Sequence, residues 1–173
     1  MNFDSSIFKA YDIRGTYPEQ VNGDIAYKIG FALATYLKPK TIAVGRDMRL
    51  SSDELNENLI RGINDFGADV VDLGLISTDG LYFAVGKFGY EGGVMITASH
   101  NPKQYNGFKI CRNEAIPLSG QEGLQDIKQT ILDDSFPEKS PIRGNIFELM
   151  SLVTTPIIVF HLLTYLILNR LKS

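Results

Sequence analysis

Between residues 22 and 74 the chain alternates between segments of helical and of strand-like pattern, and this alternation constrains the fold more than any other feature of the sequence. Apolar residues recur at helical spacing in two segments, and short apolar runs mark the other two. Such an order predicts an α/β domain, a layered fold with a mostly parallel but mixed sheet between helices and right-handed crossovers. The segments are a helix at 22–38, a strand at 41–44, a helix at 51–67 and a strand at 69–74.

Residues with capping chemistry mark the ends of these helices. Asn22 can cap the start of the first helix, and Pro39 stops it. Ser51 and Glu54 have the spacing of a capping box for the second helix, which we expect to end at Gly67.

The flanking segments extend this pattern on both sides. Residues 78–88 predict a short helix, and a strand at 94–96 is expected to pair with one at 108–111. Ser119 and Glu122 suggest a second capping box, which opens a helix. That helix is expected to bury Leu124, Ile127 and Ile131. At the other end of the chain, the apolar start of residues 7–15 predicts an N-terminal strand that ends in a turn at Gly15.

The stretch Thr97-Ala98-Ser99-His100-Asn101-Pro102 follows a buried strand and combines small, polar and chain-breaking residues. A serine at the tip of a strand is well placed to present its hydroxyl. Taken alone, a Ser-His pair more often marks a polar turn in which Ser99 and Asn101 bond to nearby backbone. A catalytic base lies beside its serine in space rather than in sequence, so the pair by itself decides little.

Several arginines stand where a phosphate could bind. Ligands of parallel sheets gather beyond the carboxyl ends of the strands, so we expect Arg46, Arg49 and Ser99 at one edge. A guanidinium there can bind two phosphate oxygens, or it can anchor the loop through Asp47. For Arg46 the two interpretations weigh equally, and for Arg14 the residues alone favour a solvated side chain.

The longer string Thr97–Pro102, followed by Asn106-Gly107-Phe108-Lys109, closely resembles the active-serine loop of the α-D-phosphohexomutases, the phosphomannomutase/phosphoglucomutase group. Three other stretches resemble this family in the same order: Phe8–Gly15, Val44–Ser52 and Ser77–Val85. The resemblance extends over residues 7–145. It implies a fold like domain 1 of the phosphohexomutases.

The resemblance also implies a reaction. In this family the serine carries a phosphate, donates it to a hexose monophosphate to give a bisphosphate sugar, and recovers the sugar's other phosphate after the sugar turns over. Lys109 resembles the family lysine assigned to proton transfer, which needs a tuned pKa. We therefore expect catalytic roles for Ser99, Lys109, His100 and Arg14, and substrate contacts from Tyr11, Arg14, Asn101 and Lys109.

The same resemblance implies Mg²⁺, bound through the phosphate on Ser99 and by ligands of a second domain, with hexose 1,6-bisphosphate as activating primer. The sequence contains no Asp-Gly-Asp-type cluster, no Gly-Glu-Met-Ser loop and no Arg-Ser-Gly-Thr-like loop. Residues 1–140 are thus expected to form the active-serine domain, and 141–173 a linker and apolar helix leading to an absent second domain. The isolated chain would be inactive, and mannose versus glucose preference stays open.

A second class of function is also compatible with the sequence: a non-catalytic module that binds a phosphosugar or docks on a partner through its apolar tail. Residues 152–168 carry no charge, although Pro156 and His161 interrupt them. The segment is consistent with a weak membrane anchor, a helix buried against a missing or self-associating partner, or sequence altered from its parent gene. A span needs about 20 apolar residues, so we favour the buried helix over the membrane.

Composition narrows the remaining possibilities. A net charge of -3 without a basic block argues against nucleic-acid binding. The single Cys111 excludes an internal disulfide and any multi-cysteine metal site, and its place in a predicted strand suggests a buried, inert thiol. The N-terminus lacks the pattern of a secretory signal, and a cytoplasmic location is expected.

Overall fold

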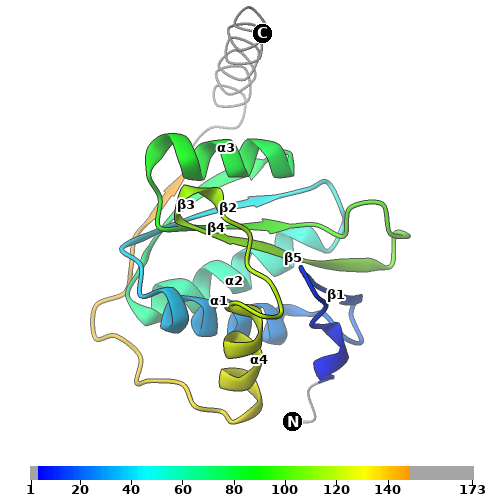
Figure 1. Cartoon of the computed structure of the whole chain (residues 1–173), viewed down its shortest axis with the longest axis horizontal. Coiled ribbons are helices and arrows are strands. Elements are labelled where there is room, and N and C mark those ends of the chain that lie inside the picture. The colour runs from blue at the N-terminus through cyan, green and yellow to red at the C-terminus, as the bar shows by residue number, and fades with distance from the viewer. Residues whose placement is uncertain (1–3, 149–173) are drawn as a thin grey trace, which may run out of the picture.

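The computed structural model describes residues 4–148, in which one six-stranded sheet lies between helices (Figure 1). The strand order is β1-β5-β4-β2-β3-β6, so the predicted α/β class is confirmed. The prediction for the apolar tail falls on residues outside the described range. The strands are β1 (Ile13–Thr16), β2 (Thr41–Arg46), β3 (Asp69–Leu75), β4 (Gly92–Ile96), β5 (Tyr105–Arg112) and β6 (Ile146–Glu148). The helices are α1 (Gly23–Leu37), α2 (Ser52–Phe66), α3 (Thr78–Phe88) and α4 (Leu124–Leu132), with 3₁₀ turns η1 (Ser5–Ile7) and η2 (Asn113–Ala115).

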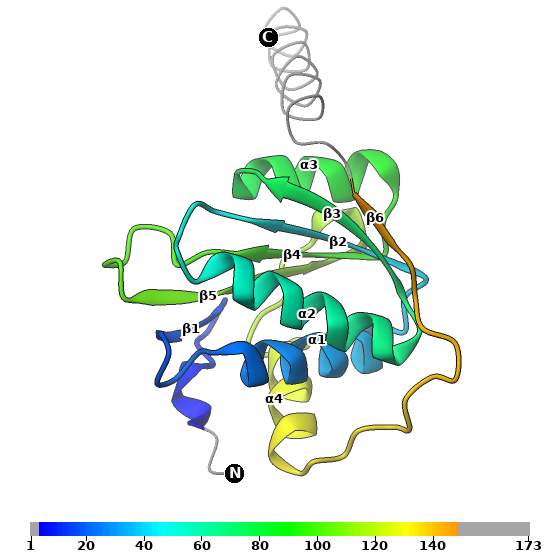
Figure 2. The same cartoon turned by 180° about the vertical axis from the view of Figure 1, so that it is seen from behind.

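The sheet is mixed, as predicted. β2 pairs in parallel with both β3 and β4, and β6 adds in parallel to β3. β5 returns antiparallel to β4, and β1 pairs antiparallel with β5. Figures 1 and 2 show α1, α2 and α4 on one face of the sheet and α3 on the other.

Two apolar clusters fill the space between these layers. The larger lies under α1, α2 and α4 and includes Ile29, Leu59 and Phe108, all fully buried. The smaller lies under α3 and includes Leu81 and Met95. Burial of this aliphatic and aromatic surface is the main favourable term in folding, and it fixes which face of each strand points to which helices.

The Asn22 cap is confirmed, because its side chain accepts a hydrogen bond from the Ile25 N–H at 3.1 Å. The capping box at Ser51 and Glu54 is wrong. Ser51 does occupy the cap position, but its side chain makes no cap bond. Glu54 instead turns to α1, where it accepts bonds from the Gly23 N–H at 3.0 Å and from the Tyr17 hydroxyl.

The second predicted capping box is also wrong, because α4 begins only at Leu124. Ser119 and Glu122 instead exchange backbone hydrogen bonds in a turn, and the Glu122 carboxylate pairs with Arg112 at 3.3 Å. The expected N-terminal strand at 7–15 is replaced by η1 and the short β1. Gly15 lies inside β1, paired with Asn106, rather than in a turn.

The segment after α4 returns to the domain and completes the sheet with β6. Its anchor is Asp65 of α2, whose side chain is 2% exposed. The Asp65 carboxylate accepts hydrogen bonds from Tyr27 and Lys139, each 2.8 Å long, and contacts Arg143 Nε at 2.9 Å. Residues 139–148 therefore lie against the domain.

These contacts also set the charge state of Asp65. Burial raises the pKa of the carboxyl group, but the hydrogen bonds from Lys139 and Tyr27 and the charges of Lys139 and Arg143 outweigh it. The pKa of Asp65 consequently lies below its ordinary value. A depressed folded-state pKa adds stability above the unfolded-state pKa, and that stability is lost as the pH falls through the folded-state value.

Asp65→Asn should lower the free energy of unfolding by about 1.5–3 kcal/mol at pH 7, since charged hydrogen bonds are lost. The difference from wild type should shrink as the pH falls below 3.8, where the unfolded-state carboxyl takes up its proton. Urea unfolding of wild type and Asp65→Asn across this pH range measures the difference in the free energy of unfolding. Asp134→Asn is the control, because Asp134 is exposed and 4.0 Å from Lys28. A pH-independent Asp65→Asn difference would contradict the assigned charge state.

Helices α1 and α2 approach each other backbone to backbone at two glycines. A Cβ atom on Gly30 would lie 2.2 Å from the Leu59 carbonyl oxygen, and one on Gly62 would lie 2.2 Å from the Tyr27 carbonyl oxygen. Rigid backbone stands on both sides of the contact, so any side chain would push the helices apart.

Gly30→Ala should therefore destabilise the chain by about 2–3 kcal/mol through overpacking, even though alanine favours helix. Gly86 of α3 is the matched control, because a Cβ there meets nothing within 4 Å. Gly86→Ala should raise stability by up to about 1 kcal/mol. Urea midpoints of the two variants should move in opposite directions, and a shared direction would refute the packing argument.

Candidate functional site

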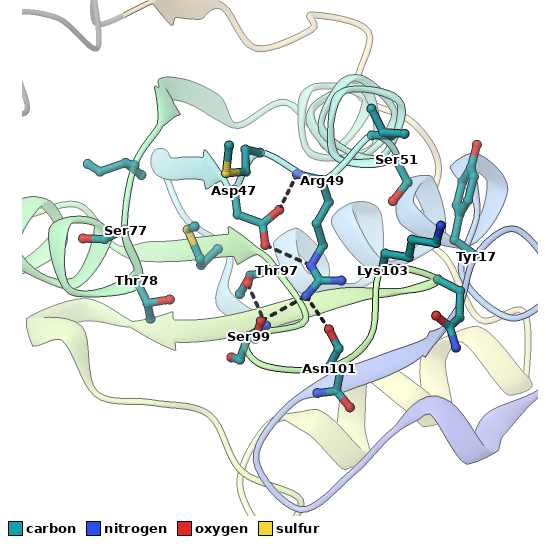
Figure 3. Close-up of a pocket in the computed structure, with 15 residues that line it drawn as sticks. Tyr17, Asp47, Arg49, Ser51, Ser77, Thr78, Thr97, Ser99, Asn101 and Lys103 are labelled. Atoms are coloured by element: carbon teal, nitrogen blue, oxygen red, sulfur yellow. Dashed lines mark hydrogen bonds and ion pairs between the residues drawn. The ribbon is translucent and has the colours of Figure 1, made fainter.

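A cleft of about 1140 Å³ opens at the carboxyl edge of the parallel strands (Figure 3). Its walls come from the segments that follow β2, β3 and β4. This is the edge where the parallel topology predicts a ligand site. The lining residues include Asp47, Arg49 and Ser51 after β2, Ser77 and Thr78 after β3, and Thr97, Ser99 and Asn101 after β4. Tyr17, Lys103 and Gln104 complete the polar part of the lining.

Ser99 lies on this wall in an exposed turn. Its backbone has φ +52°, in the left-handed region that residues other than glycine rarely adopt. Its N–H donates to Thr97 Oγ1 at 2.9 Å. Asn101 donates twice to the Ala98 carbonyl oxygen, from its backbone N–H at 3.0 Å and its side-chain amide at 2.8 Å. The Asn101 side chain thus shapes the turn.

Arg49 holds the same turn from the inside. Its guanidinium donates to the carbonyl oxygens of Ser99 at 3.0 Å and Asn101 at 2.8 Å, and to those of Pro102 and Tyr105 at 2.9 Å each. In Figure 3 dashed lines join its guanidinium to Ser99 and to Asn101. Residues 99–105, here called the serine loop, are therefore tied to the segment that follows β2.

The loop-anchoring interpretation is confirmed for Arg49, whose Nε also reaches Asp47 Oδ2 at 3.3 Å. It is wrong for Arg46, the last residue of β2. The Arg46 guanidinium pairs with Asp53 at 2.6 Å and Asp72 at 3.6 Å, rather than with Asp47. Arg46 is the last residue of β2, whereas Arg49 lies in the segment after the strand, beside the serine loop.

Arg14 and Lys109 meet at one carboxylate. Asp12 Oδ2 is 3.9 Å from Arg14 Nη1 and 3.8 Å from Lys109 Nζ. Lys109 stands opposite Met95 in the β4–β5 pair, and directly opposed residues of an antiparallel pair share a face. Met95 lines the cleft, so the Asp12–Arg14–Lys109 group continues the cleft's side of the sheet.

Two predicted site residues lie further out. His100 is exposed in the serine loop, and Tyr11 is 74% exposed before β1. Within the described chain, Tyr11, Arg14, His100 and Lys109 are not among the residues that line the cleft, whereas Ser99 and Asn101 are. The structure therefore brings part of the predicted set to the cleft wall and the cationic pair beside it.

The sequence pattern assigns no role to Asn106, which the structure buries completely at the start of β5. Its side-chain amide donates to Ser51 Oγ at 2.8 Å and Ser52 Oγ at 3.1 Å. The bonds join the strand after the serine loop to the start of α2. The one feature of the sequence that could have indicated this role is an asparagine at the start of an apolar strand, because a buried side-chain amide needs hydrogen-bond partners.

Cys111 is fully buried under α3, as predicted for an inert thiol. Burial raises the pKa of this thiol to about 12. The thiolate is the reactive form of cysteine, so the native side chain is not a nucleophile at neutral pH.

The reaction of Cys111 with DTNB at pH 8 should be at least about 100-fold slower in the native chain than in guanidinium-unfolded chain, because burial suppresses the thiolate and blocks access. The absorbance of the released thiolate gives both rates. Native labelling as fast as unfolded labelling would show that the thiol is not protected.

Within residues 4–148, no three His, Cys, Asp or Glu side chains gather in a group that could hold a metal ion. Nor does any helix there have both the length and the apolar character to cross a bilayer.

Comparison with known proteins points to one family. Residues 5–138 match the family model described as phosphoglucomutase/phosphomannomutase, alpha/beta/alpha domain I. A phosphomannomutase of Klebsiella pneumoniae is 51% identical over 136 residues, which cover 79% of this chain and 87% of that protein. A phosphomannomutase of Escherichia coli is 46% identical over 158 residues, which cover 91% of this chain but 34% of that protein.

A solved structure agrees with these matches. The crystal structure of a phosphoglucomutase/phosphomannomutase family protein from Burkholderia thailandensis superposes with a TM-score of 0.76 at 34% identity. The match covers 85% of this chain and 33% of that one. The chain thus spans most of the Klebsiella relative and about a third of the Escherichia coli protein and of the Burkholderia structure.

Proposed function

The chain belongs to the phosphoglucomutase/phosphomannomutase family, whose domain I it contains, and on that basis we propose that Ser99 carries the phosphate in phosphoryl transfer on hexose phosphates. The observation that carries the proposal is the position of Ser99. It stands on an exposed turn at the wall of the cleft, with its backbone held by hydrogen bonds to Thr97 and Arg49.

The chemistry is a transfer between two oxygens. When a hexose bisphosphate meets the unmodified serine, a bond forms between Ser99 Oγ and phosphorus while the bond from phosphorus to a sugar oxygen breaks. The Ser99 hydroxyl gives up its proton, and the sugar oxygen receives one. Reversal at the other end of the sugar completes an isomerisation of the hexose monophosphate. Such transfers depend chiefly on positioning and on charge stabilisation.

Several side chains can provide this positioning and charge stabilisation. Phosphorylated Ser99 would bring a charge of about -2, which Arg14 and Lys109 can balance from their shared face of the sheet. Asp12 lies between the two cations and keeps them together in the absence of phosphate. We assign Lys109 to proton transfer, His100 to the rim of the serine loop, and Tyr11 to contact with a bound sugar.

The family implies Mg²⁺, and the described residues fit it incompletely. Mg²⁺ requires near-octahedral oxygen ligation. A phosphate on Ser99 would supply one side of such a site, but residues 4–148 offer no carboxylate cluster for the remainder. Residues 4–148 by themselves therefore supply only part of such a site.

The length of the relatives bears on the activity of the isolated chain. Because it spans about a third of several of them, we propose that it accepts phosphate at Ser99 but does not complete the mutase cycle. Selection between mannose and glucose phosphates would then depend on the parts of those relatives that this chain does not span. A cytoplasmic location accords with a soluble sugar phosphate as substrate.

The alternative is a module that binds a phosphosugar without taking its phosphate. The fraction of several relatives that the chain spans, about a third, favours this alternative, since the described residues supply one wall of a site. The two functions differ in one product, a covalent phosphate on Ser99.

Incubation with glucose 1,6-bisphosphate and Mg²⁺ should add one phosphate to the wild-type chain, located on Ser99 by peptide mass spectrometry. Ser99→Ala should abolish the addition, because no other hydroxyl occupies this position. Ser77→Ala is the matched control: Ser77 lines the same cleft, and its loss as a helix cap costs about 1 kcal/mol without removing the acceptor.

A coupled mutase assay on the same samples tests the second half of the proposal. No turnover is expected with glucose or mannose 1-phosphate. Ser99-dependent turnover would mean that this chain completes the site by itself. Binding of the sugar phosphate without any label on Ser99 would favour the non-catalytic module.

A further inference from the structure

We propose that Arg49 is a positioning residue for the phosphate-accepting serine, a fixed cation around which the serine loop folds. The inference rests on the proposed role of Ser99, but the geometry that supports it does not. It assigns Arg49 to the backbone of the loop rather than to the phosphate or the sugar.

The hydrogen bonds of Arg49 account for every donor of its side chain. A guanidinium has five N–H groups in a rigid planar fork. Nη1 donates to Pro102 and Tyr105, Nη2 donates to Ser99 and Asn101, and Nε donates to Asp47. With all five donors engaged and the side chain 16% exposed, Arg49 could bind a phosphate only by releasing the loop.

The loop depends on this cation because four of its carbonyl groups converge on one point. Converging carbonyl dipoles repel one another and need a donor when they are withdrawn from water. Ser99 also holds a left-handed backbone conformation, which is of order 1–3 kcal/mol unfavourable for a residue other than glycine and persists only where its surroundings impose it. The bond to the Ser99 carbonyl acts on that residue directly.

Asp47 orients the cation from the other side. Its Oδ1 accepts hydrogen bonds from the Arg49 N–H at 3.1 Å and Ser52 Oγ at 2.8 Å. Its own N–H donates to the Ile96 carbonyl oxygen at the end of β4 at 3.0 Å. Arg49 is thus fixed to α2 and to the strand from which the serine loop emerges, and it transmits the rigidity of the sheet to Ser99.

A lysine cannot reproduce this arrangement. Its ammonium group has three donors at one point, whereas the loop presents four carbonyl groups around a plane. Arg49→Lys keeps the positive charge and removes only the fork, so it separates positioning from electrostatics. Arg46→Lys is the matched control, because Arg46 ends β2 at the same edge but pairs with Asp53 and Asp72.

Hydrogen–deuterium exchange on the full chain tests, without any substrate, whether the hydrogen bonds of Arg49 clamp the serine loop. In Arg49→Lys, peptides covering residues 97–106 should exchange at least about 10-fold faster than in wild type, while peptides from β2, β4 and α1 stay unchanged. Arg46→Lys should leave the serine loop at the wild-type rate. Equal loop exchange in Arg49→Lys and wild type would overturn the clamp, and faster exchange throughout the domain would assign Arg49 to global stability instead.

Phosphorylation then tests whether the clamp serves Ser99. With glucose 1,6-bisphosphate, Arg49→Lys should take up phosphate about 10- to 100-fold more slowly, the penalty expected for a misplaced reacting group. The Kd for glucose 1-phosphate should change less than threefold. A wild-type labelling rate in Arg49→Lys would overturn the positioning role. If the wild-type chain takes up no phosphate, the proposed function fails, and the exchange result alone decides whether Arg49 clamps the loop.

Discussion

The parallel pairing of β2 with β4 is the constraint on which the site depends. These strands are not consecutive in the chain, because β3 lies between them in sequence and on the other side of β2 in the sheet. Their register sets Arg46 beside Ile96, so the segments that follow them start side by side. The bond from the Asp47 N–H to the Ile96 carbonyl extends this pairing beyond the sheet. A shift of one residue would separate Arg49 from the serine loop.

Patterns of hydrophobic residues were sufficient to predict the layers and the edge at which the cleft lies. Alternating helix and strand periods determine a parallel core, and the topology then determines where its loops meet. Asn22 illustrates a local signal that operates as expected, because its partner is three residues away. Ser51 and Glu54 have an equally good local pattern, yet Glu54 bonds to α1 instead. Its partner there, the Gly23 N–H, is 31 positions away in sequence, and the local spacing of residues cannot predict such a contact.

In the candidate site, too, local patterns predicted some residues, whereas contacts between distant segments could not be predicted. Ser99 and Asn101 could be placed at the cleft because their loop follows a recognisable strand. The contacts of Arg49 could not, because four of its five acceptors are backbone carbonyl oxygens, which every residue carries and no pattern of side chains reveals. Asp12 likewise acquires its place between Arg14 and Lys109 only when β1 pairs with β5.

Strand β6 has a consequence for whatever follows it in a longer relative. Because β6 runs parallel to β3, with Glu148 level with Asp72, the described chain heads toward the same rim of the sheet at which the cleft opens. A polypeptide attached there starts at the rim that carries Ser99, three strand positions along the sheet from β4. Its groups would meet the cleft at a high effective concentration, set by the length of the tether rather than by affinity. The direction of one short edge strand thus determines how readily the cleft can be completed by residues from elsewhere in a protein.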